Sequence, residues 1–349
     1  GKRSAENPTA NSPYSPPVNN SLTPSHQPDA IVVIQAKGIT MLTPTLIARG
    51  AVFSPATNHD GTVMAWSNRK NGTRDIYMRR GDETMAVTSD SEVDTEPALT
   101  PDGEVLIWSR RVGQDWDLYQ YLDGVIEPLV EGPGAQRKPQ ISADGSTLVF
   151  EDTDGVGVMR DGARQLLAPA EGTEISRRPR VSADGERIFW ERFDQSDRTT
   201  TLWMRDQNGS QKPLLTPEDS WTGYAISNDG RKVTYSVWTD KGEDLYSWDL
   251  TTNERKAVAN KEDVNESFPS VTNDGKTTYY TLSDFRTYPK VNTYLFRDTD
   301  GVKEELVTRD PVGRNLFSQV TPDGNLLTWM WISDDDPNDR ALFQAPTGE

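Results

Sequence analysis

Short apolar segments alternate with polar turns along most of the chain. Segments such as Val-Met-Ala-Trp66 and Arg-Ile-Phe-Trp190 end on an aromatic residue, and an Asp-Gly pair comes shortly before each of them. Hydrophobic runs of this length between turn residues are typical of β-strands. Asp-Gly favours a tight hairpin, because Gly adopts positive φ at little cost and Asp tolerates it. The pattern therefore predicts a succession of hairpins.

The Asp-Gly pair recurs at intervals of 40 to 49 residues, with its Asp at Asp60, Asp102, Asp144, Asp184, Asp229, Asp274 and Asp323. We number these copies as repeats 1 to 7. An aromatic residue follows each Asp by six positions, at Trp66, Trp108, Phe150, Trp190, Tyr235, Tyr280 and Trp329. Repeats 2 to 7 also carry Ser or Thr two residues before the Asp, whereas repeat 1 is interpreted as having an insertion at residues 55–59. A period near 40–45 residues with several strands indicates a β-propeller.

We therefore expect an all-β, seven-bladed propeller of four-stranded antiparallel blades. Repeat 7 runs out after its third strand, and residues 37–43 resemble a fourth strand without a blade. An N-terminal strand there would complete the C-terminal blade and close the ring, which removes exposed sheet edges. Residues 29–349 form this single domain in our prediction. Residues 1–28 are rich in Pro, Ser and Asn, and we expect a flexible tether because such a composition buries little apolar surface.

The repeat resembles a known family. The pattern Ser/Thr-x-Asp-Gly, four residues and an aromatic, as in Ser182-Ala-Asp184-Gly185 to Trp190, is similar to the TolB-type, WD-like repeat of bacterial envelope proteins. The resemblance covers about residues 38–345 and implies a propeller fold. TolB proteins have six such blades and a further domain, so the seventh repeat departs from them. Similar repeats occur in prolyl-oligopeptidase-like peptidases, whose Gly-x-Ser-x-Gly motif is absent here, and in lyases of acidic polysaccharides.

Composition narrows the chemistry. The formal net charge is −17, which disfavours nucleic acid as a partner, since phosphate binding rests on clustered Lys and Arg. The chain has no Cys, and its two His residues are His26 and His59. A Ser-His-Asp triad and a His- or Cys-based metal site are therefore not expected. A Tyr–Arg pair for β-elimination stays open as an enzymatic alternative.

Acidic loops are the candidate metal sites. The segment at residues 333–339 crowds carboxylates between two predicted strands, and Asp334, Asp336 and Asp339 could bind calcium, which prefers several oxygen ligands. The other interpretation is a solvated turn. We expect no cofactor, with calcium at this loop as the alternative.

The first strand of each blade lines the central channel, so residues just before it are expected at one channel mouth. Most repeats carry a cation in this stretch, and two carry aromatic residues. Arg grips carboxylates well, and aromatic rings add a stacking wall. The candidate ligand-binding residues are Arg49, Arg137, Lys138, Arg177, Arg178, Trp221, Tyr224, Phe268 and Arg314. The alternative is that these cations pair with nearby Asp and Glu at strand ends.

The sequence thus predicts a non-catalytic binding or scaffold propeller of the bacterial cell envelope or secreted fraction. Its basic channel mouth would capture a protein or acidic peptide, or an anionic saccharide. We expect a monomer that is periplasmic, extracellular or envelope-anchored through residues 1–28. The alternative is a propeller-type lyase or glycoside hydrolase that acts on an acidic polysaccharide.

Overall fold

The computed structural model describes residues 39–70, 72–286, 290–307 and 313–348. The chain divides into two units, Gly1–Ile34 and Gln35–Glu349, and every described residue belongs to the second. The domain boundary predicted at residue 28 lies outside the described residues. Within them, the only helix is the 3₁₀ turn η1 (Pro217–Asp219). No helix in this part of the chain is long and apolar enough to span a membrane.

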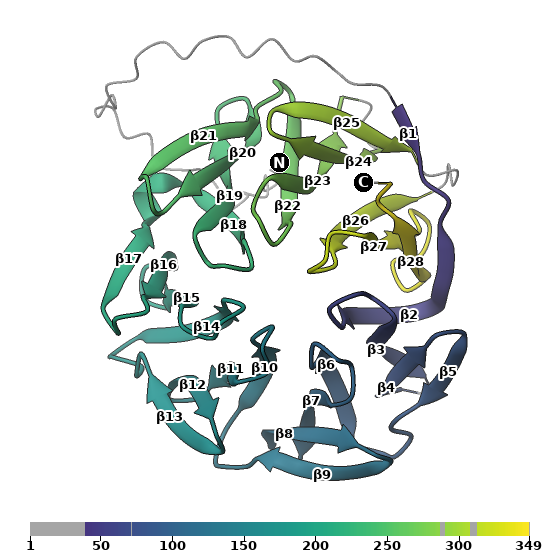
Figure 1. Ribbon diagram of the computed structural model, residues 1–349, viewed down its shortest axis with the longest axis vertical. Coiled ribbons are helices and arrows are strands. Elements are labelled where there is room, and N and C mark those ends of the chain that lie inside the picture. The colour runs from purple at the N-terminus through teal and green to yellow at the C-terminus, as the bar shows by residue number, and fades with distance from the viewer. Residues whose placement is uncertain (1–38, 71, 287–289, 308–312, 349) are drawn as a thin grey trace, which may run out of the picture. The chain divides into compact units, whose positions relative to one another are not determined.

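Four consecutive strands form each of repeats 1 to 6, three form repeat 7, and all pairs within a repeat are antiparallel (Figure 1). The strands of repeats 1 and 2 are β2 (Thr45–Thr57), β3 (Val63–Lys70), β4 (Thr73–Arg80), β5 (Glu83–Ala86), β6 (Val93–Leu99), β7 (Leu106–Val112), β8 (Asp115–Leu122) and β9 (Val125–Val130). Those of repeats 3 and 4 are β10 (Gln136–Ile141), β11 (Thr147–Asp152), β12 (Gly155–Arg160), β13 (Ala163–Leu167), β14 (Glu174–Val181), β15 (Ile188–Asp194), β16 (Thr199–Arg205) and β17 (Gln211–Leu215).

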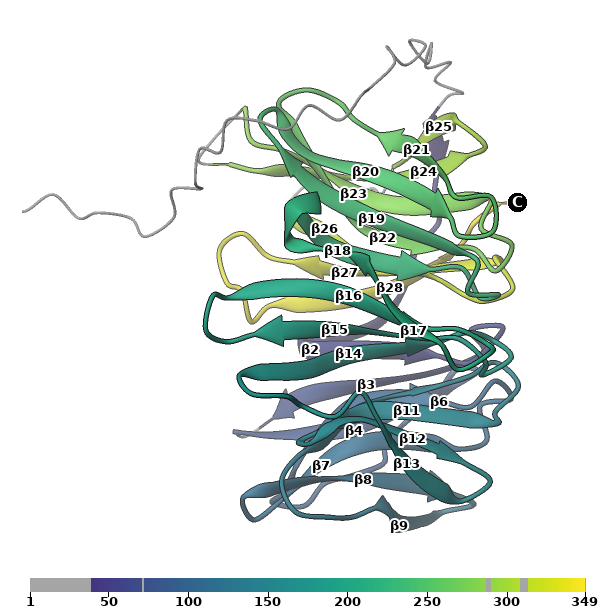
Figure 2. The same ribbon diagram turned by 90° about the vertical axis from the view of Figure 1, so that its left-hand side faces the viewer.

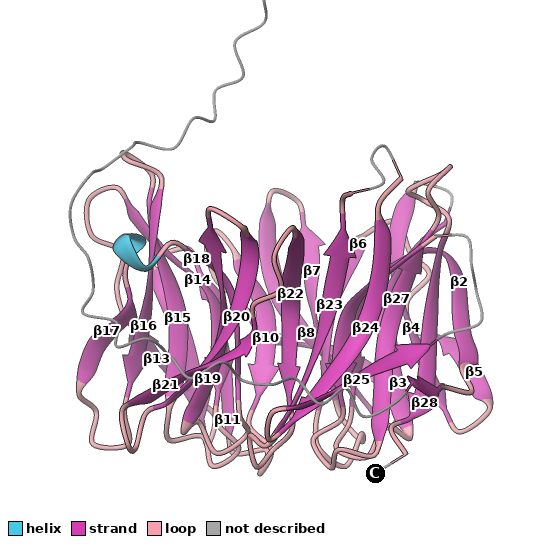
Figure 3. Cartoon of the chain, turned by 90° about the horizontal axis from the view of Figure 1, so that it is seen from above, coloured by secondary structure: helices cyan, strands magenta, loops and turns pink. Residues whose placement is uncertain are grey.

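The C-terminal half continues this order. The strands of repeats 5 and 6 are β18 (Trp221–Ile226), β19 (Lys232–Thr239), β20 (Gly242–Asp249), β21 (Glu254–Ala259), β22 (Val264–Val271), β23 (Thr277–Asp284), β24 (Asn292–Thr299) and β25 (Val302–Val307). Repeat 7 contributes β26 (Arg314–Val320), β27 (Leu326–Ile332) and β28 (Arg340–Pro346). The strands run along a common direction, with loops gathered at their two ends (Figures 2 and 3). The first strand of each repeat lies innermost in Figure 1, and the structure is all-β and propeller-like.

The repeats are joined in different ways. Repeats 2, 3 and 4 form separate four-stranded sheets. Repeats 5 and 6 share one sheet, because β20 and β22 pair in parallel over Gly242 and Glu243. Repeats 1 and 7 share β2, whose first part, from Thr45 to Gly50, pairs with β28 and whose second part pairs with β3.

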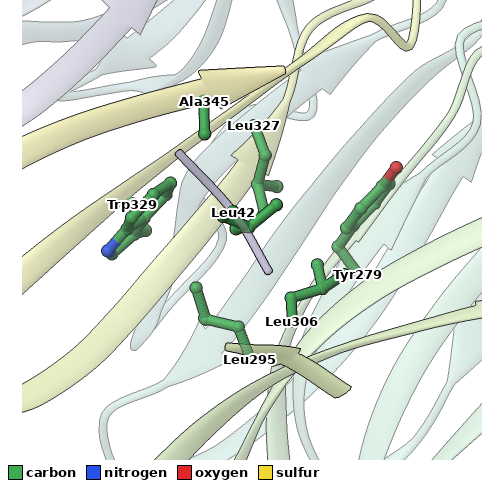
Figure 4. Close-up of a cluster of buried hydrophobic side chains, with 7 residues drawn as sticks. All are labelled: Leu42, Tyr279, Leu295, Leu306, Leu327, Trp329 and Ala345. Carbon is green, nitrogen blue, oxygen red and sulfur yellow. The ribbon is translucent and has the colours of Figure 1, made fainter. Parts of the chain in front are cut away.

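The N-terminal strand differs from the prediction. Residues 37 and 38 are outside the described residues, and β1 (Ile39–Met41) pairs in parallel with β25 of repeat 6. The strand that pairs with β28 is the following segment, Thr45 to Gly50. Between the two, Leu42 inserts into a buried cluster from repeats 6 and 7, formed with Tyr279, Leu295, Leu306, Leu327, Trp329 and Ala345 (Figure 4). The assignment of residues 37–43 to the last blade is therefore wrong, because this segment contacts both repeats from outside β25.

The Asp-Gly turns form as predicted. In repeats 2 to 7 the Ser or Thr two residues before the Asp donates to the Asp carboxylate and accepts from the backbone amide five residues onward. The bond from Thr100 is the largest cause that lowers the pKa of Asp102. In repeat 1, Asn58 fills this position and accepts from the amide of Val63 at 3.0 Å. The insertion inferred at residues 55–59 is therefore wrong, since Asn58 replaces the hydroxyl in the same turn.

The seven aromatic residues of the second strands are all buried, as predicted, with 3 % exposure or less. Six of them lie against an aromatic of the third strand, with ring centroids 5.7 to 6.3 Å apart. Repeat 3 is the exception, because Gly157 stands opposite Phe150 and a Cβ there would approach the ring to 2.1 Å. Large rings at one depth in every repeat supply most of the packing between neighbouring sheets.

Candidate functional site

A β-bulge interrupts the innermost strand of each repeat. Outside repeat 5 it lies at one repeat position, six residues before the Asp of the turn, and a non-glycine residue there has φ between 48° and 57°. We call these the bulge residues: Ser54, Glu96, Lys138, Arg178, Phe268 and Phe317. In repeat 5 the register shift lies between Trp221 and Gly223, and Gly223 occupies the corresponding position. Left-handed backbone costs an ordinary residue about 1–2 kcal/mol, and such strain concentrates at functional sites.

The bulge turns backbone amides away from the strand ladder, so they need other acceptors. The Lys138 amide donates to the Ser109 hydroxyl at 3.1 Å, on the second strand of the preceding repeat. The Arg178 amide donates to Glu151 at 2.7 Å, again on the preceding repeat. The side chain of the preceding second strand therefore holds each of these two bulges in place.

Ion pairs lie beside these two hydrogen bonds, one between repeats 2 and 3 and three within repeats 3 and 4. Seven residues form what we call the charged cluster: Glu96, Arg137, Lys138, Glu151, Arg177, Arg178 and Glu191. Arg137 pairs with Glu96 at 2.7 Å, and Lys138 pairs with Glu151 at 2.8 Å. Arg177 and Arg178 share Glu191, at 2.9 and 3.2 Å. These four cations thus pair with nearby Glu residues, as the alternative interpretation of the sequence expected.

The cations of the cluster are more exposed than the carboxylates. Their side chains are 29 to 53 % exposed, with Arg178 the most exposed, whereas the carboxylates are 3 to 17 % exposed. The cluster also contains four cations and three anions. Solvent therefore meets mainly positive charge at this part of the inner strands, although the whole chain is strongly acidic.

The bulge residues of repeats 6 and 7 have different chemistry. Phe268 and Phe317, which we call the aromatic pair, lie with ring centroids 4.5 Å apart and planes tilted by 58°. They remain 39 % and 42 % exposed. Phe268 was among the predicted binding residues and Phe317 was not. Two large apolar side chains thus meet at the solvent, on backbone that a smaller residue would occupy more easily.

Repeat 5 lies between these two groups. The Tyr224 hydroxyl donates to the carbonyl oxygen of Arg178 at 3.0 Å, and desolvation raises the pKa of Tyr224 despite the nearby charge of Arg180. Trp221 donates its indole N–H to the Thr200 carbonyl oxygen at 3.2 Å. Both rings pack on the apolar cluster between repeats 4 and 5. They therefore join repeats 4 and 5 as well as bordering the charged cluster.

Arg49 and Arg314 lie apart from the other predicted binding residues. Arg49 is in the part of β2 that pairs with β28, and it pairs with Asp339 at 3.1 Å. Arg314, the first residue of β26, pairs with Asp334 at 3.3 Å. Both cations thus contact the acidic loop of repeat 7. They are not aligned with the bulge residues, because Arg49 lies eleven residues and Arg314 nine residues before the Asp of its turn.

The same loop contains the predicted calcium ligands. Asp334 and Asp339 face the two arginines, and Asp336 accepts from the backbone and side-chain nitrogens of Asn338. No group of three or more His, Cys, Asp or Glu side chains in the described residues is arranged to hold a metal ion. The contacts of these carboxylates match those of a solvated turn.

The position of the predicted binding residues also differs from the expectation. Arg137, Lys138, Arg177, Arg178 and Phe268 lie inside the innermost strands, at or beside the bulges, and not before the strands begin. The prediction missed Ser54 and Phe317. A usable signal existed, since a Pro follows the bulge residue in five repeats, at Pro55, Pro97, Pro139, Pro179 and Pro269.

A surface hollow lies elsewhere on the domain. It has a volume of about 680 Å³ and is lined by outer parts of repeats 1 and 2, including Met85, Glu104 and Tyr121. None of the predicted binding residues lines it.

Solved structures with a similar fold include enzymes and a TolB protein. A prolyl endopeptidase structure aligns with a TM-score of 0.65 and 13% identity over 87% of this chain, and this chain spans only about half (49%) of its length. Oligogalacturonate lyase from Vibrio parahaemolyticus aligns with a TM-score of 0.57 and 10% identity, covering 84% of this chain and 86% of the lyase. TolB from Acinetobacter baumannii aligns with a TM-score of 0.48 and 15% identity, covering 84% of this chain and 65% of the TolB chain.

No protein-family model matches the sequence, and no curated protein matches it either. At these identities the structural likeness concerns the fold alone. An oligogalacturonate lyase of similar fold was solved in complex with manganese. The described residues of this chain do not fit such an ion, because they contain no group of three potential metal-binding side chains. The comparisons thus support a propeller-type fold.

Proposed function

We propose that this protein is a non-catalytic binding propeller that captures an anionic ligand, either an acidic peptide or an acidic saccharide, at the charged cluster. In this proposal the seven repeats are seven blades of a closed ring, and the cluster faces its central channel. The shared strand β2, which pairs with both β28 and β3, supports closure. Closing a ring in this way protects the sheet edges of the first and last blades.

The observation that carries the proposal is the difference in exposure within the charged cluster. Covered carboxylates hold the cations in place, and the cations keep part of their surface for a ligand. Arg178 is half exposed and is fixed by its backbone bonds to Glu151 and Tyr224. A pre-positioned guanidinium binds a carboxylate with less loss of entropy than a free one.

Two observations favour binding over lyase chemistry. At the charged cluster, Tyr224 lies beside Arg178, but the Tyr224 hydroxyl already donates to the backbone carbonyl of Arg178. Its raised pKa makes Tyr224 a poor base, so Tyr224 could serve only as the acid of a Tyr–Arg pair, and its hydroxyl proton is already bonded. The lyase alternative thus rests on fold-level likeness. The bacterial envelope or the secreted fraction is the proposed setting, on the resemblance of the repeats to the TolB type.

The test uses two defined polyanions, poly-L-glutamate and oligogalacturonate, with neutral dextran as the control polymer. Calorimetric titration at low salt is expected to detect binding of a polyanion and none of dextran. The double substitution Lys138→Glu and Arg178→Glu should weaken polyanion binding by tenfold or more. The matched control, Lys212→Glu with Lys256→Glu, reverses two cations on the outer strands β17 and β21 and should change binding little.

The same titrations separate binding from catalysis. Incubation with oligogalacturonate is expected to leave ultraviolet absorbance unchanged, because no unsaturated product forms. A rise in absorbance would support the lyase alternative. Equal weakening by the outer-strand control would show that overall charge, and not the charged cluster, attracts the polyanion. Absence of binding to both polyanions would overturn the proposal.

A further inference from the structure

The aromatic pair extends the proposed site beyond anion binding. Phe268 and Phe317 occupy the same repeat position as Lys138 and Arg178, in the innermost strands of repeats 6 and 7. All four side chains thus start from equivalent points of the repeated fold. We infer that the ligand is an acidic peptide with an apolar side chain, which packs on the aromatic pair while a carboxylate of the same peptide binds Arg178. This inference rests on the proposed function and names its ligand class.

Phenylalanine at these two positions is unfavourable for the folded chain by itself. Its φ is 55° in Phe268 and 56° in Phe317, where bulky residues are genuine outliers. Each ring also leaves about two fifths of its surface in water. Ser54 and Gly223 stand at the same position in other repeats, so the fold accepts small residues there. A bound apolar group would recover the surface that the two rings expose.

The geometry of the aromatic pair fits an apolar side chain better than a sugar. A sugar ring stacks on one flat aromatic face, but these rings are tilted by 58° at a centroid distance of 4.5 Å. Each ring therefore turns part of its surface toward its partner, and together they present an angled apolar surface. Phe also has no polar group to bond sugar hydroxyls. Such a surface suits an aliphatic or aromatic side chain.

A peptide that contacts both Arg178 and the aromatic pair would pass repeat 5, where the bulge position carries no side chain. Repeat 5 separates Arg178 in repeat 4 from Phe268 in repeat 6, and Gly223 occupies the equivalent position of repeat 5. A peptide backbone can approach a glycine closely because there is no Cβ. The exposed charge at one end is positive, which complements an acidic residue, and the exposed surface at the other end is apolar. An extended peptide with both kinds of side chain matches both ends.

The test is a panel of synthetic twelve-residue peptides measured by calorimetric titration. Each acidic–apolar peptide carries two Glu residues and one Phe, separated by one to six Gly or Ser residues. Acidic-only peptides have Ser in place of the Phe, and apolar-only peptides have Gln in place of both Glu. At the best spacing, the acidic–apolar peptide is expected to bind at least tenfold more tightly than either control, since burial of one large apolar side chain provides that much.

Variants of the protein test whether the aromatic pair causes this gain in affinity of the acidic–apolar peptide over the acidic-only peptide. Phe268→Ala with Phe317→Ala should reduce the acidic–apolar peptide to the affinity of the acidic-only peptide. Phe317→Gly, which suits the left-handed backbone, should remove a large part of the gain and guards against misfolding of the double variant. Trp238→Ala removes another exposed aromatic side chain, 54 % exposed on β19, and should leave the gain unchanged.

The outcomes separate this inference from the proposed function. If acidic-only and acidic–apolar peptides bind equally, or if the gain survives in the double phenylalanine variant, the inference is overturned and anion binding stands. If oligogalacturonate binds and no peptide does, the peptide assignment is likewise overturned. If neither the peptides nor the polyanions bind, both this inference and the proposed function are overturned.

Discussion

Apolar clusters join neighbouring repeats in both halves of the described domain, but the contacts at the bulges of repeats 2 to 4 differ from those of repeats 6 and 7. In repeats 2 to 4, the bulge residues Glu96 and Arg178 are each connected to a neighbouring repeat, Glu96 by its ion pair with Arg137 and Arg178 by a charge-assisted hydrogen bond from its amide to Glu151. In repeats 6 and 7, the aromatic pair meets on the inner strands, and Leu42 fills an apolar cluster between the same repeats. The backbone distortion is the same in both regions. The repeated backbone thus belongs to the fold, and the side chain that it presents is free to vary with function.

This difference can be tested by substitutions on each side. On the apolar side, stability depends on burial, which salt affects little. On the charged side, partly exposed ion pairs add to the apolar packing, and salt weakens them. The predictions below run from the largest expected effect to the smallest.

Leu42→Ala should cause the largest loss of stability. Leu42 is 4 % exposed and contacts residues of both repeat 6 and repeat 7 (Figure 4). Removal of a buried leucine side chain costs about 2–5 kcal/mol, and urea denaturation should report a loss in this range. Leu46→Ala is the control, since Leu46 is 49 % exposed on β2 and should cost far less. Equal losses in the two variants would show that Leu42 does not hold the two repeats together.

Glu266→Gln should change how stability depends on pH. Glu266 is 2 % exposed in β22, and desolvation raises its pKa to about 7 although the Lys261 amide donates to both its oxygens. Its pKa in the unfolded chain is 4.5, so folding retains a proton between these values. The stability that this group contributes is complete below pH 4.5 and is lost as the pH rises through 7.

The substituted amide carries no titrating proton. Between pH 4 and pH 8 the free energy of unfolding of the natural chain should therefore fall by about 3 kcal/mol relative to that of Glu266→Gln. Urea midpoints at both pH values measure this change. A constant difference across the pH range would contradict the prediction. Glu191 is also a buried carboxylate, but it differs from Glu266 in having two arginine partners.

Glu191→Gln should destabilise the charged side. Glu191 holds Arg177 and Arg178, and loss of its charge leaves two adjacent guanidinium groups without their anion. Breaking a fully buried pair costs 3–5 kcal/mol, but these arginines are partly exposed, so we expect about 2 kcal/mol. The control is Glu254→Gln in the exposed pair with Lys256, which should cost less than about 0.5 kcal/mol. Similar losses in both variants would mean that the covered carboxylate has no special role.

The smallest effect concerns the bulge itself. Phe317→Gly should be about 1 kcal/mol more stable than Phe317→Ala, because φ at this position is 56° and glycine accepts it without strain. At Trp238, inside β19, the order should reverse and glycine should be less stable than alanine. Denaturation of the four variants gives both differences. If glycine were more stable than alanine at both positions, or less stable at both, backbone strain at the bulge would not explain the difference.

Much of the fold could be predicted because its signals are local. Each Asp-Gly turn carries its own hydroxyl or amide partner, and each second strand carries its own buried ring. The N-terminal segment was assigned to the wrong strand, since both residues 37–43 and Thr45 to Gly50 contain strand-forming residues. The partner of Thr45 is Gln344, and no local pattern can indicate a partner so distant in sequence.

The site could be predicted only in part. The cations of repeats 3 and 4 were identified, but the carboxylate partners of Lys138, Arg177 and Arg178 lie on second strands whose register was not known. The bulges were missed because lysine, arginine and phenylalanine give no sign of positive φ. Phe317 was missed for an additional reason, since Ser318 follows it where five of the other repeats have Pro.

The long pairing of β2 with β28 has a consequence for synthesis of the chain. On the ribosome, residues 45–50 emerge early, and their partners at residues 340–344 emerge almost 300 residues later. At typical elongation rates of about 5–20 residues per second, this half of β2 waits for about 15 seconds or more without its partner. During that time it is an exposed strand edge in a crowded cell, where such edges promote aggregation. The seam between the first and last repeats thus forms only after residues 340–344 have been made, and its first half needs protection from aggregation until then.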